Sequence, residues 1–246
     1  MFNLRFSREM ALKEISVDGY EIIRNSYVVV VGIGATGSPA ADLFVRAGIG
    51  KIRLIDGDSV DISNIHRQIL YSENDVGRKK TDAASERLRK INGDCEIESV
   101  PQFLSQENAS ELIGKPSIVI DGTDNMQTRR IINSYCVANR IPWVFISSIG
   151  TVSQAKGILP GSTSCLDCFV DRNVNYSMSC EETGVLASAP VMASSLAWTI
   201  ALRILLNQDE KGDLYYIDPW NLVMEKIHIN RNPQCPTCSN IQNLMA

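Results

Sequence analysis

Tyr27-Val-Val-Val-Val31, followed by Gly32-Ile-Gly-Ala-Thr-Gly37, is the stretch of sequence that decides the fold of this chain. The β-branched run is typical of a strand buried on both faces of a sheet. Residues 38–47 then place apolar side chains on one helical face, and Gly48 supplies a natural C-cap. A strand, a glycine-rich turn and a helix in this order predict the central strand of an α/β sheet.

The glycine turn has the G-x-G-x-x-G form, with glycines at Gly32, Gly34 and Gly37. Between a strand and a helix, such a turn lets backbone N–H groups approach phosphate at a positive helix end. Asp56 follows the next predicted strand, about 20 residues later, where an acid normally accepts hydrogen bonds from ribose hydroxyls. The pattern predicts a nucleotide site without naming the nucleotide, and the alternative is a turn that serves only close packing.

Strands and helices continue to alternate outward from this unit. The expected strands are 51–55, 96–100, 117–120 and 143–147, and the expected helices are 79–91, 106–113 and 126–139. This order implies right-handed crossover connections between parallel strands. It predicts a Rossmann-like α/β fold with a mainly parallel sheet and helices on both faces.

The pattern changes after Gly150. Three later stretches alternate apolar with polar residues and predict antiparallel strands, at 151–159, 214–218 and 222–229. A cysteine-bearing loop, 163–183, and an apolar helix, about 190–206, lie between them. No repeat or low-complexity linker separates these parts, so we expect residues 1–246 to form one domain.

Composition narrows the class of protein. The chain has 246 residues, of which 44% are hydrophobic and 21% charged, so one domain can bury a large core. The net charge of -4 offers no broad cationic surface for nucleic acid. The first ten residues lack the continuous apolar core of a secretory signal, and the stretch 185–206 contains Pro190 and Arg203, which favours a core helix over a membrane span. We expect a cytoplasmic protein without nucleic-acid or membrane partners.

Polar side chains after the second strand favour ATP over a nicotinamide dinucleotide. The loop that ends at Gln68 carries Asn64 and Arg67, and Lys80 begins the next predicted helix. Arg67 and Lys80 would neutralise the charge that builds up on phosphoryl oxygens as pyrophosphate leaves. A nicotinamide dehydrogenase would also suit the turn and Asp56, but it has no role for these cations. For either cation alone, an ordinary solvated surface residue is the alternative.

Asp124 lies just past the apolar strand 117–120, at the edge where α/β sheets place ligands. Magnesium usually takes one or two carboxylates together with substrate phosphates, so a single acid suffices there. The sequence therefore offers Asp124 as a magnesium ligand. The alternative is that Asp124 only N-caps the helix that begins near Met126.

Four of the seven cysteines form two Cys-x-x-Cys pairs, Cys165-Leu-Asp-Cys168 and Cys235-Pro-Thr-Cys238. Four thiolates in two such pairs are the ligand set of a closed structural zinc site. A bound metal would pin the C-terminal segment to the cysteine loop and leave no open position for chemistry. Two disulfides are the alternative, which a cytoplasmic location disfavours.

Six motifs follow one another in a fixed order along almost the whole chain. They are Arg5-Phe-Ser-Arg8, the glycine turn, Asp56-Gly-Asp58 with Ser63-Asn-Ile-His-Arg-Gln68, Val76-Gly-Arg-Lys-Lys80, Asp121-Gly-Thr-Asp-Asn125 and the two cysteine pairs. In this order they resemble the MoeB/ThiF/HesA family, the ubiquitin-activating-type adenylyltransferases. Each motif alone is weakly specific, whereas the ordered series makes chance agreement negligible.

This resemblance implies a set of contacts with ATP and magnesium. It implies phosphate on the glycine turn, ribose on Asp56, further nucleotide contacts from Asp58 and Gln68, phosphate contacts from Asn64, Arg67 and Lys80, and Mg²⁺ on Asp124. The C-terminal Gly-Gly tail of a small ubiquitin-fold sulfur carrier would attack the α-phosphate and give an acyl-adenylate and pyrophosphate. Proximity would supply much of the catalysis, because the tail is held in line with the phosphate.

Two further residues receive a role from the resemblance. Arg8 looks like a finger that reaches into the active site of a neighbouring subunit, which implies a homodimer with two composite sites. The alternative is a free surface arginine. Cys180 falls in the family's crossover loop, where some members carry a cysteine that bonds covalently to the carrier. A covalent role and an incidental role for Cys180 stay equally open.

Two rival functions lie close to this prediction. One is a family member that adenylates a carboxylate on a modified tRNA base or on a short peptide, and the acidic balance of the chain disfavours tRNA. The other is a catalytically silent subunit, but such halves usually lose phosphate-contacting residues that are all present here. The sequence leaves the pathway open among molybdopterin synthesis, thiamine synthesis, tRNA thiolation and protein conjugation, because that choice lies with the carrier.

Overall fold

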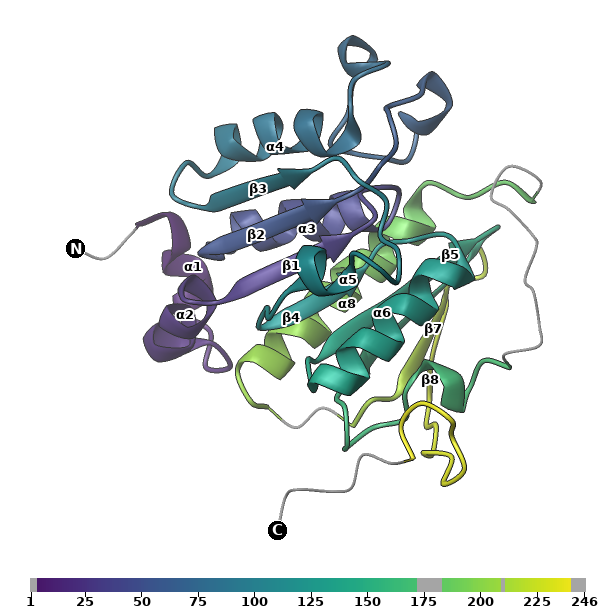
Figure 1. Ribbon diagram of the computed structural model, residues 1–246. Helices are drawn as coiled ribbons and strands as arrows, with labels where there is room; N and C mark the ends of the chain where they lie inside the picture. Colours follow the sequence, from purple (N-terminus) through teal and green to yellow (C-terminus); the bar gives the residue numbers. More distant parts are fainter. Residues whose placement is uncertain (1–3, 172–182, 209–210, 240–246) are drawn as a thin grey trace.

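A computed structural model describes residues 4–171, 183–208 and 211–239 (Figure 1). These residues build an eight-stranded sheet in the order β3-β2-β1-β4-β5-β6-β7-β8. The strands are β1 (Tyr27–Val31), β2 (Lys51–Ile55), β3 (Glu96–Val100), β4 (Ile118–Asp121), β5 (Trp143–Ile149), β6 (Val152–Ile158), β7 (Leu214–Asp218) and β8 (Val223–Ile227). Strands β1 to β5 pair in parallel, and β6 to β8 continue the sheet antiparallel. The predicted fold class is therefore confirmed.

Helices cover both faces of this sheet (Figure 1). They are α1 (Ser7–Met10), α2 (Ser16–Arg24), α3 (Gly37–Arg46), α4 (Lys80–Ile91), α5 (Ala109–Ile113), α6 (Met126–Asn139) and α8 (Ser188–Leu205), with 3-10 turns η1 (Leu4–Phe6), η2 (Ile62–Asn64), η3 (Glu73–Asp75) and η4 (Leu166–Cys168). Val28 and Val30 pack with α2, α3, α4 and α8, whereas Val29 and Val31 pack with α5 and α6. Because successive strand residues point to opposite faces, the all-valine β1 supplies both cores.

The strand order places a crevice between β1 and β4. The chain moves outward from β1 to β3 and then returns to β4 on the other side of β1. Val31 lies opposite Ile55 of β2 and Asp121 of β4, so the residues that follow these strands meet at one edge. Open α/β sheets bind ligands at such a reversal, beyond the carboxyl ends of the strands.

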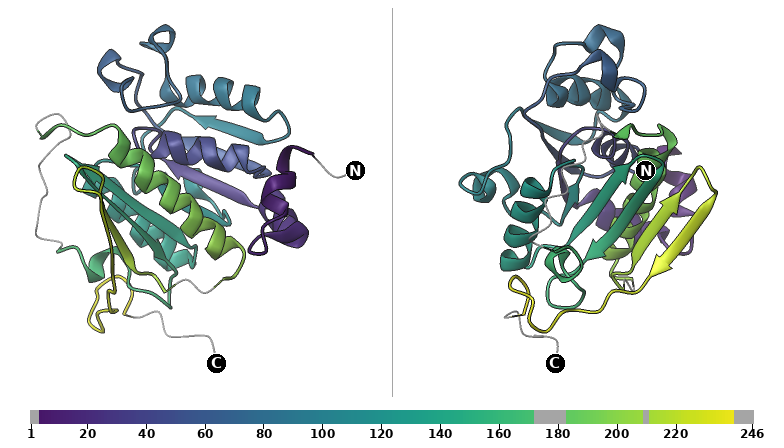
Figure 2. Two further views of the ribbon diagram at one scale, coloured as in Figure 1. Left: turned by 180° about the vertical axis from the view of Figure 1, so that it is seen from behind. Right: turned by 90° about the vertical axis from the view of Figure 1, so that its right-hand side faces the viewer.

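Helix α8 is the one helix of the described residues that is long and apolar enough to cross a membrane. It packs instead along β5, β6 and α3, as the view from behind shows (Figure 2). Ala193, Ala197 and Ile200 are buried in that contact. In this fold α8 is a core helix, as its Pro190 and Arg203 indicate.

Two local features differ from the sequence prediction. The helix expected at 106–113 begins only at Ala109, because Ser105 and Asn108 form a turn by bonding each other's backbone N–H groups, at 2.7 and 3.4 Å. Helices α1 and α2 have no counterpart in the prediction. Only Gly19, Tyr20 and Ile23 of α2 are buried, which is too short an apolar pattern to identify a helix.

Candidate active site

A cavity of about 540 Å³ opens at the carboxyl ends of β1, β2, β4 and β5. The predicted site residues that line it are Gly32, Gly34, Asp56, Asp58, Arg67, Gln68, Lys80 and Asp124. Gly37, Asn64 and Arg8 are not among the lining residues, and Cys180 lies outside the described part of the chain. The volume falls within the range of small-molecule sites. The fold thus gathers most of the predicted nucleotide residues around one cavity.

The three glycines of the turn serve different purposes. A Cβ at Gly32, whose φ is +80°, would lie 2.7 Å from the carbonyl oxygen of Gly122, and a Cβ at Gly37 would overlap the carbonyl oxygen of Gly32. These two positions therefore require glycine for packing. A Cβ at Gly34 would meet only Gln68 Nε2, at 3.8 Å, and would otherwise point into open space. The open space at Gly34 is suited to the close approach of a ligand to the backbone.

Asp56 is buried beside the turn. Its Oδ2 accepts a hydrogen bond from the Ile33 backbone N–H at 2.7 Å, and its Oδ1 accepts one from the Asp58 backbone N–H at 2.8 Å. Burial raises the pKa of Asp56, while Lys80 and the two backbone N–H groups oppose that rise. Each carboxylate oxygen keeps lone-pair capacity beyond these bonds, so ribose hydroxyls fit this position.

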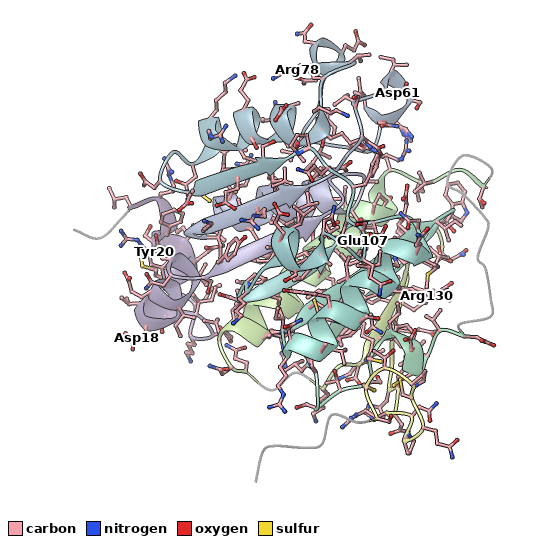
Figure 3. All side chains as sticks on the ribbon, viewed as in Figure 1. Asp18, Tyr20, Asp61, Arg78, Glu107 and Arg130 are labelled. Carbon is pink, nitrogen blue, oxygen red and sulfur yellow. The ribbon has the colours of Figure 1, made fainter. Side chains whose placement is uncertain are left out.

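Two cations reach the same cavity from the segment between β2 and α4. Lys80, the first residue of α4, is buried and its Nζ lies 3.0 Å from Asp58 Oδ2. Arg67 donates to the Ser63 carbonyl at 2.8 Å and forms no ion pair within the described residues. Figure 3 labels Asp61 in the loop that carries Arg67. The cavity therefore holds two cations close to the carboxylates of Asp56, Asp58 and Asp124.

Gln68 lines the cavity with an unused hydrogen-bonding group. Its side chain is buried, yet Oε1 has no partner among the described residues. An unpartnered buried amide oxygen costs free energy in the empty protein. The Gln68 amide oxygen is therefore free to accept a hydrogen bond from a ligand or a bound water.

Asp124 is exposed on the cavity rim. The N-cap of α6 is Asn125, whose Oδ1 accepts the Thr128 backbone N–H at 2.8 Å, so the alternative role of Asp124 as helix cap is wrong. The Asp124 carboxylate has no hydrogen bond or ion pair in the described part of the chain. It therefore remains available to a cation or a ligand.

Arg129 and Phe103 are among the residues of the cavity wall that sequence reasoning missed. Arg129 is buried and pairs with Asp121 at 3.2 Å. The sequence could have indicated Arg129, because it lies one helical turn before Ile132 and Asn133 and so on the buried face of α6. Phe103 is 68% exposed and its ring covers Gly57, where a Cβ would lie 2.5 Å away. An aromatic residue in the loop that follows β3 was the signal for Phe103.

The four cysteines of the two pairs meet in one cluster, with their sulfur atoms within 4.8 Å of one another. Cys165 Sγ lies 3.9 Å from Cys168 Sγ and 3.5 Å from Cys235 Sγ, and Cys168 Sγ lies 3.5 Å from Cys238 Sγ. Four sulfurs at about 2.3 Å from a tetrahedral zinc ion would be separated by about 3.8 Å. The separations are too long for disulfides, and the described cysteines are free. The cluster can hold a metal ion.

Arg8 lies near the amino ends of the parallel strands, whereas the cavity opens at their carboxyl ends. The N-terminal segment packs at the amino ends because Phe6 stacks on Tyr20 with ring centroids 5.0 Å apart, and Arg5 donates to Asn92 at 2.6 Å. Phe6 also covers Gly48, which precedes the amino end of β2. In Figure 1 the labels α1 and α2 stand beside the amino ends of β1 and β2. Arg8 is therefore remote from the cavity of its own subunit.

A parallel sheet with a glycine turn, a buried acid and two cations at the strand reversal defines a nucleotide-binding α/β protein. The profile of the ThiF family matches residues 6–237, and the chain belongs to this family.

Curated relatives match this chain over most of its length and are named as adenylyltransferases. The sulfur carrier protein ThiS adenylyltransferase of Escherichia coli (strain K12) is 30% identical over 237 residues, covering 96% of this chain and 94% of the relative. The sulfur carrier protein adenylyltransferase of Thermus thermophilus is 33% identical over 249 residues, covering 96% and 90%. The ThiS adenylyltransferase of Bacillus subtilis is 32% identical, covering 95% and 71%. The chain is an adenylyltransferase.

Solved structures share the fold. The crystal structure of E. coli MccB with AMPCPP and MccA has a TM-score of 0.84 at 22% identity, over 96% of this chain and 75% of that chain. The crystal structure of PaaA has a TM-score of 0.75 at 24% identity, over 92% and 82%. At this level of identity the likeness concerns the arrangement of the chain alone.

Proposed function

We propose that this protein adenylates the C-terminal glycine carboxylate of a small ubiquitin-fold sulfur carrier with ATP, giving an acyl-adenylate and pyrophosphate. The names of the curated relatives support a sulfur carrier as substrate. The observation that carries the proposal is the cavity at the β1 and β4 reversal, where Gln68 and Asp124 lack partners among the described residues beside the cations Arg67 and Lys80. A carboxylate that can bind magnesium, cations that can bind phosphate and an amide that can bind the nucleotide lie in one cavity. This combination suits a magnesium nucleotide.

Each cavity residue then has a role in binding ATP. Backbone N–H groups of the turn and the N-terminus of α3 bind phosphate, and Asp56 accepts the ribose hydroxyls. Lys80 and Arg67 stabilise negative charge on the phosphoryl oxygens. Asp124 would hold Mg²⁺, which would supply charge neutralisation for the phosphates when bound. Asn64, whose Nδ2 donates to Ser63 Oγ at 3.3 Å, stays a predicted phosphate contact because it does not line the cavity.

The reaction itself needs no nucleophile from the protein. A carboxylate oxygen of the carrier's terminal glycine forms a bond to the α-phosphorus, and the bond from that phosphorus to the bridging oxygen breaks. The electron pair leaves with pyrophosphate, so no proton transfer is required. The cavity continues past Ser147 and Gln154 on β5 and β6, which gives an extended tail a path toward the α-phosphate. Alignment of the two reactants supplies much of the acceleration.

We further propose that the active unit is a homodimer in which Arg8 completes the cavity of the other subunit. The position of Arg8 at the amino edge of the sheet supports action in trans, since its own cavity opens at the carboxyl edge. Mixing Arg8→Ala subunits with Asp124→Ala subunits should restore activity, because half of the randomly formed dimers contain one intact composite site, about a quarter of all sites. A monomer in sedimentation, or no recovery on mixing, would refute this arrangement.

We also propose that residues 1–246 act as one adenylation domain and that the cysteine cluster holds a structural zinc ion. The closed geometry of the cluster supports zinc, since four thiolates leave no position for a substrate.

Isotope exchange between pyrophosphate and ATP tests the proposed substrate. Candidate ubiquitin-fold carriers that end in Gly-Gly would be compared with the same carriers lacking the last glycine. Exchange that depends on the intact tail supports the proposal. Exchange driven by a short peptide or by a tRNA-borne carboxylate, and by no carrier, would favour the alternative in which a family member activates a carboxylate of another kind.

A further inference from the structure

We infer that Arg129 is a positioning residue that braces the loop 122–125 and thereby fixes the carboxylate of Asp124 at the cavity rim. This inference rests on the proposed role of Asp124 in holding Mg²⁺.

Arg129 reaches from the first turn of α6 back to three other parts of the fold. Its Nε donates to Asp121 Oδ2 at 3.2 Å, at the end of β4. Its Nη2 donates to the carbonyl oxygen of Thr123 at 2.6 Å and to that of Ile146 on β5 at 2.9 Å. The guanidinium carbon lies 5.1 Å from the ring centroid of Phe145. The planar fork of arginine can make these bonds together, and a lysine cannot.

Asp121 completes the brace from the other side. It is fully buried, and its Oδ1 accepts both the Thr123 backbone N–H at 3.0 Å and the Thr123 hydroxyl at 2.6 Å. Thr123 is thus held at its N–H, its hydroxyl and its carbonyl by one buried ion pair. Breaking a buried ion pair by removing one partner leaves an uncompensated charge, so Asp121 and Arg129 act as a unit.

Asp124 takes its position from these neighbours. Its carboxylate has no partner of its own among the described residues. Thr123 on one side belongs to the brace, and Asn125 on the other side caps α6 through its bond to Thr128 N–H. The backbone on both sides of Asp124 is therefore fixed while its side chain stays free. Ligand groups held this way are pre-organised for an ion, and loosening the support lowers metal affinity.

Arg129 also connects the loop to the opposite wall of the cavity. Ile146 lies on β5, whose later residues Ser147 and Ile149 line the cavity. Because one Nη2 bonds both Thr123 and Ile146, the brace sets the separation between Asp124 and that wall. A displacement of about 1 Å at a reacting centre can cost about 10²-fold in rate.

Binding of Mn²⁺ to the protein saturated with AMPCPP tests the brace without any carrier. The variants are Arg129→Lys, Arg129→Gln and Thr123→Val, with Arg130→Gln as matched control. Arg130, labelled on α6 in Figure 3, donates to the Asp171 carbonyl at 3.3 Å instead of to the loop. Arg129→Gln should weaken Mn²⁺ binding by about 10- to 100-fold, as removal of a group that supports a metal ligand typically does. Arg129→Lys should weaken it less, and Arg130→Gln should stay within about twofold of the wild type.

Three readouts separate positioning from a general loss of structure. Because Arg129 also lines the cavity, metal-free AMPCPP affinity is measured for each variant as the baseline for its Mn²⁺ affinity, and circular dichroism reports whether the variant is folded. In an Asp124→Asn background, Arg129→Gln should add no further loss of Mn²⁺ affinity, since the two changes act on one ligand. A folded Arg129→Gln variant that binds Mn²⁺ like the wild type would overturn the inference. If Arg129→Gln does not fold, Thr123→Val decides instead, and unchanged Mn²⁺ binding in that variant overturns it.

The same measurements distinguish failure of the Arg129 inference from failure of the proposed function. If no carrier supports exchange while Mn²⁺ binding still depends on Asp124 and Arg129, the carrier assignment fails and the brace stands. If Asp124→Asn binds Mn²⁺ like the wild type, the metal role of Asp124 and the inference fall together.

Discussion

The nucleotide cavity and the cysteine cluster differ in the groups that they offer to a bound species: carboxylates, cations and amides in the cavity, and four thiols in the cluster. In the cavity, Gln68 Oε1 and the Asp124 carboxylate have no partner among the described residues. In the cluster, the four sulfurs lie together, Thr237 donates to Asp167, and Asn133 Nδ2 lies 3.8 Å from Cys165 Sγ. Unpartnered polar groups cost stability. Under the proposed function the cavity keeps its groups for a ligand, whereas the cluster, which could hold a metal ion, would serve the fold.

One helix connects the two regions. Arg129 and Asn133 are four residues apart on α6 and so lie on the same face. Arg129 bonds the cavity loop, while Asn133 Oδ1 accepts the Leu166 backbone N–H at 3.2 Å beside the cluster. Damage to the cavity should thus reduce activity with little effect on stability. Damage to the cluster should reduce stability and reach activity only through α6.

The largest expected effect is that of Asp124→Ala on activity. Loss of a group that organises charge on the transferring phosphate should lower carrier-dependent pyrophosphate exchange by about 10³-fold. The melting temperature should change little, because Asp124 is exposed and makes no bond within the described chain. Exchange kinetics and calorimetry on the same preparation measure both quantities. Retained exchange would remove Asp124 from the mechanism.

The opposite pattern is expected for Cys238→Ser. One lost ligand should weaken the closed metal site and lower the free energy of unfolding by about 3 kcal/mol, equivalent to roughly 6–12 °C in melting temperature for a chain of this size. Metal content by mass spectrometry and thermal unfolding check this. Cys95→Ala is the matched control, because Cys95 is a buried cysteine outside the cluster. Equal metal content in Cys238→Ser and Cys95→Ala would remove Cys238 from the metal site.

The same contrast explains how much of the fold could be predicted from sequence. The bounds of β1, β2, β3 and α6 match the prediction, because buried β-branched runs and a long periodic helix leave little choice. The cysteine cluster was predicted from spacing alone, because two Cys-x-x-Cys pairs specify their own geometry. The start of α5 was not predictable, since it depends on the local bonds between Ser105 and Asn108.

The cavity was predictable only in part. Residues on the turn and the following loop carry their signal in sequence, because a motif places them close to the phosphates. Arg129 and Phe103 carry no such motif, and they reach the cavity through the pairing of β4 with β5 and through contact with Gly57. Sequence spacing does not encode these long-range contacts. Arg8 was assigned by resemblance alone, and its role in a neighbouring subunit stays a prediction.

A smaller effect should appear in the pH dependence of nucleotide binding. Burial raises the pKa of Asp56 above its ordinary value of 3.8, against the opposing effect of Lys80. Under the proposed function the ionised carboxylate accepts the ribose hydroxyls, so affinity for AMPCPP should fall as the pH is lowered from about 7 toward that raised pKa. Titration calorimetry across this range measures the fall. In Asp56→Asn the affinity should be lower and this part of its pH dependence absent.

The stability of the ligand-free protein should respond with the opposite sign. A carboxyl group whose folded pKa is raised contributes stability below its unfolded pKa, and that contribution is lost as the pH rises through the folded pKa. Relative to Asp56→Asn, the wild type should therefore gain stability, and lose nucleotide affinity, as the pH falls. Identical pH profiles in the two proteins would contradict the buried, ribose-binding role of Asp56.

The smallest effect is expected for Cys180→Ala, a cysteine that belongs to neither predicted pair. Carboxylate attack on the α-phosphate needs no side-chain nucleophile, so pyrophosphate exchange should stay within about twofold of the wild type. Loss of exchange would contradict the mechanism, because it would require Cys180 in the adenylation step. Incubation with carrier and ATP, analysed without reductant, separates the two open roles. A reductant-sensitive adduct in the wild type and not in the variant would assign Cys180 to a covalent step after adenylation, and the absence of any adduct would leave it incidental.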